Sequence, residues 1–193
     1  MLVENNVQPT FINLKNLCLA KYELIYKIVD GMNVTSVNEI NSKQQLQFIR
    51  IHNKFHHLNL MYLDSRLPEI IGDLALEVFI NKMNSIQEYI NSKRKIDDFA
   101  ENYDLRYYKY KLSDFVYMLL YSNISANEVF DGKEQTTRVY CSKNATESIQ
   151  YFSIYERNAL IDKLLNELKL SITIDKNVIS KNEIKLHFKF NIL

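Results

Sequence analysis

The sequence contains few of the residues that break helices and few of the cysteines that cross-link small domains. Its 193 residues include three glycines, two prolines, two cysteines and no tryptophan. Because glycine and proline mark most tight turns, their scarcity favours long helices over a many-turned β-sandwich or barrel. Two cysteines fit neither a disulfide framework nor a four-cysteine zinc site. Three scattered glycines also exclude a glycine-rich phosphate loop, which argues against a classical nucleotide-binding enzyme.

The charge and hydropathy patterns lack a strong bias. The chain has 24 Lys and Arg against 23 Asp and Glu, a net charge of +1, so it has no general attraction to nucleic acid or acidic partners. It contains no run of about 18 apolar residues and no basic N-terminal region followed by an apolar run. We therefore predict no membrane partner and a cytoplasmic location. The 47% hydrophobic residues are enough for one buried core.

The spacing of the apolar residues predicts a mainly α protein. A Ser36-Val37-Asn38-Glu39 capping box would open one of the helices, and Thr10 would cap another. The expected helices cover residues 10–30, 36–58, 67–91, 103–121 and 152–168. The first part of the chain is therefore predicted to be a helical bundle of about four to five helices.

The last part of the sequence has a different pattern. Residues 136–141 favour a strand, and residues 170–175 and 183–190 alternate apolar and polar side chains, which predicts a hairpin. The bundle is thus expected to continue into a small C-terminal α+β segment ending in a β-hairpin. A charged connector at 92–98 suggests a division into residues 1–95, a helical bundle, and residues 96–193, its helical continuation, with one shared core.

A cluster of histidines is the main candidate for chemistry. Three of the four histidines fall within residues 52–57. On a helix, with about 100° per residue, Arg50, Asn53 and His57 would share one polar face. Histidine can transfer a proton near neutral pH, and arginine can bind the phosphate oxygens of a transition state. Since RNA supplies its own 2′-hydroxyl nucleophile, such a face would suit RNA cleavage without a metal or another cofactor.

This segment resembles a known motif. The residues Arg50-Ile51-His52-Asn53-Lys54-Phe55-His56-His57 are similar to the Arg-x4–6-His motif of the HEPN superfamily, many of whose members are metal-independent RNases in toxin–antitoxin and phage-defence systems. The resemblance covers residues 10–95. It implies a homodimeric endoribonuclease in which Arg50 binds phosphate, His57 transfers the proton and Asn53 or His52 positions the substrate. The commoner form of the motif has its arginine where His52 stands.

Two other interpretations of the cluster remain open. The polar residues could form an ordinary solvated helix face. Alternatively, His52 and His56 have the spacing of two metal ligands on a helix, with a remote carboxylate such as Asp64 or Glu69 as the third.

A second segment favours RNA contacts. Residues 106–111 interleave cations with tyrosines, as single-strand binders do. We therefore expect Arg106 and Lys109 to contact RNA, together with His52 and Lys54. The plainer alternative places Arg106 and Lys109 on the solvated flank of an apolar stripe.

The tail carries two further patterns. Asp175 with Glu183-Ile184-Lys185 imitates the Asp…Glu-x-Lys signature of metal-dependent nucleases, but these residues flank a turn, which is the wrong order along a hairpin. Residues 152–190 resemble the final helix and hairpin of large serine recombinases, although the catalytic serine domain and zinc ribbon of that family are absent.

The sequence thus supports two functional hypotheses. The first is a HEPN-like, metal-independent RNase that acts as a homodimer. The second is a non-catalytic helical factor of a phage, mobile element or defence system that binds a protein or nucleic acid.

Overall fold

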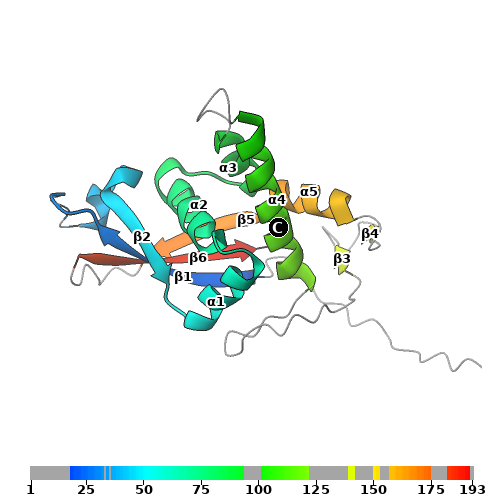
Figure 1. Cartoon of the computed structure of the whole chain (residues 1–193), viewed down its shortest axis with the longest axis horizontal. Coiled ribbons are helices and arrows are strands. Elements are labelled where there is room, and N and C mark those ends of the chain that lie inside the picture. The colour runs from blue at the N-terminus through cyan, green and yellow to red at the C-terminus, as the bar shows by residue number, and fades with distance from the viewer. Residues whose placement is uncertain are drawn as a thin grey trace, which may run out of the picture.

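A four-stranded antiparallel sheet under a layer of helices forms the centre of the computed structural model (Figure 1). The structure describes residues 18–32, 34, 36–93, 101–121, 139–141, 150–152, 157–174 and 182–191. The sheet has the strand order β2-β1-β6-β5. Its strands are β1 (Cys18–Ile28), β2 (Leu46–Ile51), β5 (Lys169–Ile174) and β6 (Glu183–Asn191). Two short strands, β3 (Val139–Cys141) and β4 (Gln150–Phe152), pair separately.

Five α-helices lie among the described residues. They are α1 (Lys54–Leu63), α2 (Leu67–Asn81), α3 (Ile86–Ser92), α4 (Glu101–Tyr121) and α5 (Arg157–Glu167). Two 3-10 turns, η1 (Val37–Glu39) and η2 (Lys43–Gln45), lead into β2. Helix α2 packs against β2 and β5, while α1 contacts β2 and α4 contacts β1. The helices therefore cover one face of the sheet.

Alternating side chains explain why the sheet forms and which face it buries. In β6, Ile184, Leu186, Phe188 and Phe190 are buried, and the residues between them are not. In β1 the buried residues that alternate in this way are Tyr22, Leu24, Tyr26 and Ile28, and Ile25 on the other face is buried as well. Because successive side chains of a strand point to opposite faces, the alternating residues meet the helices, and their neighbours in sequence form an outward face.

A glycine lets α2 approach the sheet closely. A Cβ atom at Gly72 would lie 2.6 Å from the ring of Phe48 on β2. The buried Tyr26 hydroxyl donates a 2.7 Å hydrogen bond to the carbonyl oxygen of Gly72. Helix and sheet are thus joined by a close contact and a buried hydrogen bond at the same place.

The prediction of a mainly α helical bundle was wrong. The structure is mixed α/β, and its sheet includes the N-terminal strand β1 where a helix over residues 10–30 was expected. Apolar residues at helical spacing also occur in this segment, but Tyr22, Leu24, Tyr26 and Ile28 alternate as well, and pairing with both β2 and β6 favours the extended form. Residues 10–17 of that expected helix lie outside the described residues.

The helix predicted over residues 36–58 was also wrong. Its capping box is present, since Ser36 and Glu39 bond reciprocally, but it opens only the short turn η1. Strand β2 and the start of α1 occupy the rest of the segment. The helix expected over residues 67–91 is divided into α2 and α3, with Lys82 in the left-handed conformation that ends α2.

Other predicted elements agree with the structure. The helix expected at 103–121 is α4, the one at 152–168 contains α5, and the terminal hairpin is β5 paired with β6. The strand expected at 136–141 matches β3 at residues 139–141, and its first three residues lie outside the described part. The division between residues 95 and 96 stays a prediction.

Candidate nucleic-acid interface

The outward face of the sheet concentrates positive charge. Its cations are Lys21 and Lys27 on β1, Arg50 on β2, Lys169 on β5, and Lys185 and Lys189 on β6. The carboxylates at described positions on this face are Glu23 and Glu183. Because the whole chain has a net charge of only +1, this excess of cations is a local property of one surface.

The strand register brings these polar side chains next to one another. Lys21 lies opposite Lys189, and Glu23 lies opposite His187. Ile25 lies between Arg50 of β2 and Lys185 of β6. Paired residues on one face of an antiparallel sheet have Cβ atoms about 5 Å apart, so the side chains of this central strip are immediate neighbours.

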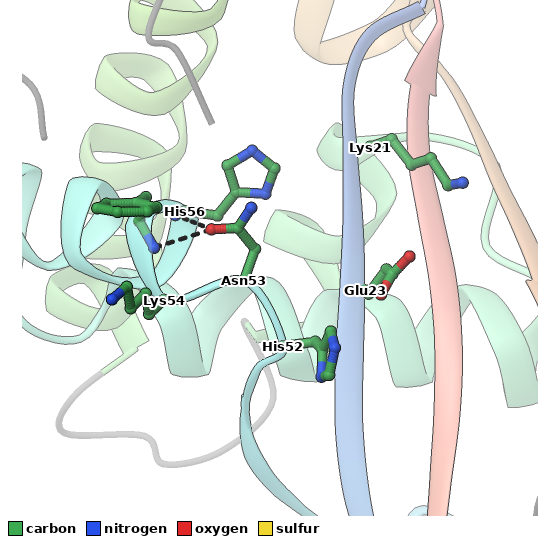
Figure 2. A pocket seen from close by; sticks show the side chains of 7 residues that line it. Lys21, Glu23, His52, Asn53, Lys54 and His56 are labelled. Carbon is green, nitrogen blue, oxygen red and sulfur yellow. Dashed lines mark hydrogen bonds between the residues drawn. The ribbon is translucent and has the colours of Figure 1, made fainter. Parts of the chain in front are cut away.

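A pocket opens at the edge of this face, beside the N-terminus of α1. Its volume is about 600 Å³, and it is lined by Lys21, Glu23 and residues 52–56. Figure 2 shows Lys21 and Glu23 on β1, His52 beside that strand, and Lys54 and His56 at the start of α1. Pockets of this size accept small-molecule ligands, and a nucleotide unit is of that order.

Hydrogen bonds fix the segment that carries the histidines. The His52 backbone N–H donates to the carbonyl oxygen of Glu23 at 2.7 Å, which ties the end of β2 to β1. Asn53 is the N-cap of α1, and its Oδ1 accepts from the N–H groups of Phe55 and His56 at 2.9 and 3.3 Å (Figure 2). The pocket wall is therefore built on capped, paired backbone.

Glu23 lies between two basic groups of β6. The Lys185 Nζ is 3.4 Å from its Oε2, and the His187 Nδ1 is 3.6 Å from its Oε1. These partners come from a strand more than 150 residues away in sequence, and only the β1–β6 pairing brings them together.

The two histidines of α1 are in partly buried surroundings. Burial lowers the pKa of His56, and the opposing field of Glu23 raises it less. The His56 ring packs edge-on against Tyr22, with 5.3 Å between ring centroids. Burial also lowers the pKa of His57, whose Nδ1 accepts from the Ile51 N–H at 3.5 Å. Both imidazoles are therefore mainly neutral at pH 7.

Arg50, Asn53 and His57 do not lie on one helical face. Arg50 is an exposed residue of strand β2, Asn53 caps α1, and His57 lies in the first turn of that helix, facing back to Ile51. The predicted juxtaposition rested on a helix that the structure replaces with strand, turn and helix. A catalytic role for these three residues stays a prediction.

The residues predicted to bind nucleic acid divide into two groups. His52 and Lys54 line the pocket. Arg106 and Lys109 are exposed on α4, where Lys109 pairs with Asp162 of α5 at 3.1 Å, so they belong to the helical layer. Sequence reasoning missed Lys21, Glu23 and His187. The alternation in residues 21–27 and 183–190 was the signal that could have placed them on one face.

The described part of the chain contains neither a cluster of metal-binding side chains nor a membrane-spanning helix. No group of three or more His, Cys, Asp or Glu side chains there could hold a metal ion. Within the same ranges, no helix is both long and apolar enough to cross a membrane.

Comparison with known proteins identifies the family. The family model for the HpaII restriction endonuclease matches residues 12–192. The chain belongs to the HpaII restriction endonuclease family. It is also 24% identical over 159 residues to the type II restriction enzyme HpaII of Haemophilus parainfluenzae, a match that covers 77% of this chain and 44% of that enzyme. The chain thus spans less than half the length of this relative. No solved structure matches.

The HpaII family match corrects both earlier resemblances. It includes the Arg50–His57 segment and the C-terminal tail, so neither the HEPN superfamily nor the large serine recombinases accounts for this chain. An RNase function was therefore a wrong prediction, as was the non-catalytic accessory factor. The family is one of restriction endonucleases. The expected homodimer stays a prediction.

Proposed function

We propose that this chain binds double-stranded DNA and cleaves it as a type II restriction endonuclease of the HpaII family, with the outward face of the sheet against the DNA. The observation that carries this proposal is the gathering of six cations on one sheet face of a chain from this family. We place the protein in the cytoplasm, because a restriction enzyme has to reach DNA there.

The size of the cationic face suits a DNA backbone. Lys21 and Lys27 lie six residues apart on one strand, and a strand rises about 3.3 Å per residue, which separates them by about 20 Å. Successive phosphates of one DNA strand advance about 3.4 Å along the helix axis, so the face extends along roughly half a turn. Lysine and arginine contacts to phosphates release counterions and supply affinity that does not depend on sequence.

The pocket suits a single phosphate at the edge of that surface. Lys21 and Lys54 provide two cations, and the exposed His52 provides a hydrogen-bonding imidazole. DNA lacks the 2′-hydroxyl that lets RNA attack its own phosphate, so cleavage requires water as the nucleophile. A phosphate held beside Lys21 would have its negative charge stabilised during that attack.

Duplex binding at several salt concentrations tests the proposed surface. We expect the Lys21→Ala/Lys189→Ala double variant to bind at least about tenfold more weakly in fluorescence anisotropy. Its slope of log affinity against log salt should be smaller by about 2, because about one counterion is released for each phosphate contact. Lys82→Asn is the matched control. Lys82 is exposed at the end of α2, and asparagine tolerates its left-handed backbone. Equal binding by the double variant and the native chain would reject the surface.

Cleavage of DNA tests the enzymatic part. The native chain is incubated with plasmid DNA and Mg²⁺, and with an RNA of matched length. We expect discrete DNA fragments and intact RNA. Binding without cleavage would reduce the function to DNA binding, and cleavage of the RNA alone would overturn the proposal.

A further inference from the structure

Glu23 is an unusual residue for a phosphate-binding surface. Among the described residues that line the pocket it is the one carboxylate, with Lys21, Lys54 and two histidines around it. A carboxylate beside a phosphate opposes binding through charge repulsion. Its place in the pocket therefore calls for a role other than holding DNA.

We infer, on the basis of the proposed function, that Glu23 is the catalytic base for hydrolysis of the DNA phosphodiester. The Glu23 carboxylate takes a proton from a water molecule as the water oxygen bonds to phosphorus. The bond from phosphorus to the departing sugar oxygen then breaks, and that oxygen takes a proton from solvent. The products are a phosphate monoester and an alcohol, so no oxidant or reductant is needed.

The contacts and the solvent exposure of the Glu23 carboxylate are compatible with this step. The Lys185 Nζ donates a 3.4 Å hydrogen bond to one carboxylate oxygen, and the His187 Nδ1 lies 3.6 Å from the other. A carboxylate has about four lone-pair positions, so these two contacts leave positions for a water. The side chain is 35% exposed, so solvent reaches it.

The backbone of Glu23 is fixed as well. Its carbonyl accepts from the His52 N–H at 2.7 Å, and it lies within a strand paired on both sides. Lys21, two residues earlier on the same strand, points to the same face and lines the same pocket. A phosphate bound by Lys21 would therefore lie next to the carboxylate.

The test compares Glu23→Gln with the native chain in single-turnover cleavage and in DNA binding. Glutamine keeps the shape of the side chain but does not accept a proton. We expect cleavage to slow by about 100-fold or more, as for loss of a general base. DNA affinity should stay equal or rise, because a negative charge is removed. Glu69→Gln, an equal charge change at an exposed site on α2, should cleave at the native rate.

The other outcomes reject the inference in distinguishable ways. Glu23→Gln cleaving within about threefold of the native rate would reject the base and leave the DNA endonuclease intact. Parallel loss of binding and cleavage would make Glu23 a structural residue. Recovery of the variant at high Mg²⁺ would assign the carboxylate to cation binding. A native chain that binds DNA without cleaving it would overturn the endonuclease and the catalytic base together.

Discussion

At the scale of single residues, Asp73 of α2 shows how a polar group can hold several elements together. It accepts a 2.8 Å hydrogen bond from the Tyr89 hydroxyl of α3 and pairs with Lys43 of η2 at 2.5 Å and with Lys93. Burial and the charge of Asp73 both raise the pKa of Tyr89, so its hydroxyl stays a donor. Lys43 also bonds Glu77 at 2.6 Å. Because the two lysines offset the two carboxylates, we interpret this cluster as a structural one.

Replacing Asp73 by Asn should therefore destabilise the fold. Burial by itself would raise the pKa of Asp73, but the hydrogen bonds and charges of Lys43 and Lys93 lower it overall. A lowered carboxyl pKa contributes stability that is complete above the unfolded value, near 4, and is lost as the pH falls below it. We expect a loss of about 2 kcal/mol at pH 7, discounted for the partial exposure of the group. Urea unfolding at pH 7 and pH 3 checks this. The difference between the two proteins should be smaller at pH 3 than at pH 7, and a constant difference would contradict the assignment.

At the scale of elements, the direction of α1 relative to β2 depends on the turn that connects them. The chain leaves the sheet at Ile51, passes His52 and begins the helix at Lys54, with Asn53 as the cap. Because His52 and Asn53 connect the strand to the helix, they set the direction in which Lys54 and His56 face the pocket.

Loss of that cap should be measurable. Asn53→Ala leaves the Phe55 and His56 N–H groups without their side-chain acceptor, and we expect a loss of about 1 kcal/mol in urea unfolding. Asn53→Asp keeps an acceptor at the same position and should stay within about 0.5 kcal/mol of the native protein. If both variants lose the same stability, the capping interaction is not what stabilises α1.

How much could be predicted differs from element to element for physical reasons. Helix α4 and the β5–β6 hairpin were foreseen, because their residues carry the pattern without help from the rest of the chain. Strand β1 was not, because its form depends on pairing with β6, far along the sequence. The pocket itself was not predicted. His52 and Lys54 belong to the histidine-rich segment that the sequence indicated as a candidate site. Lys21 and Glu23 lie beside them only because β1 is an extended strand.

At the scale of the whole molecule, the helical layer and the sheet approach each other closely at Gly72 and Phe48. A methyl group at residue 72 would lie 2.6 to 3.0 Å from three ring atoms of Phe48, closer than packed atoms allow. The Phe48 ring also packs edge-on against Tyr26, with 5.6 Å between centroids, which limits its movement.

Gly72→Ala should therefore push the two layers apart. We expect a loss of about 1–3 kcal/mol, typical of an overpacked core, despite the better helix propensity of alanine. The matched test is a double-mutant cycle with Phe48→Ala, measured by thermal and urea unfolding. Removing the ring should relieve the clash, so the double variant should lose less than the sum of the two single losses. Additive losses would mean that Gly72 is needed for another reason.

The pairing of β1 with β6 has a consequence for folding during synthesis on the ribosome. The two strands that carry Lys21, Glu23, Lys185 and Lys189 are translated at widely separated times. Contacts between such distant segments form slowly. Here they can form only after β6 has left the ribosomal exit tunnel. A nascent chain that stops before β6 lacks Lys185 and Lys189 of the proposed DNA-binding surface. Under the proposed function, any cutting activity would therefore begin only after β6 has been synthesised.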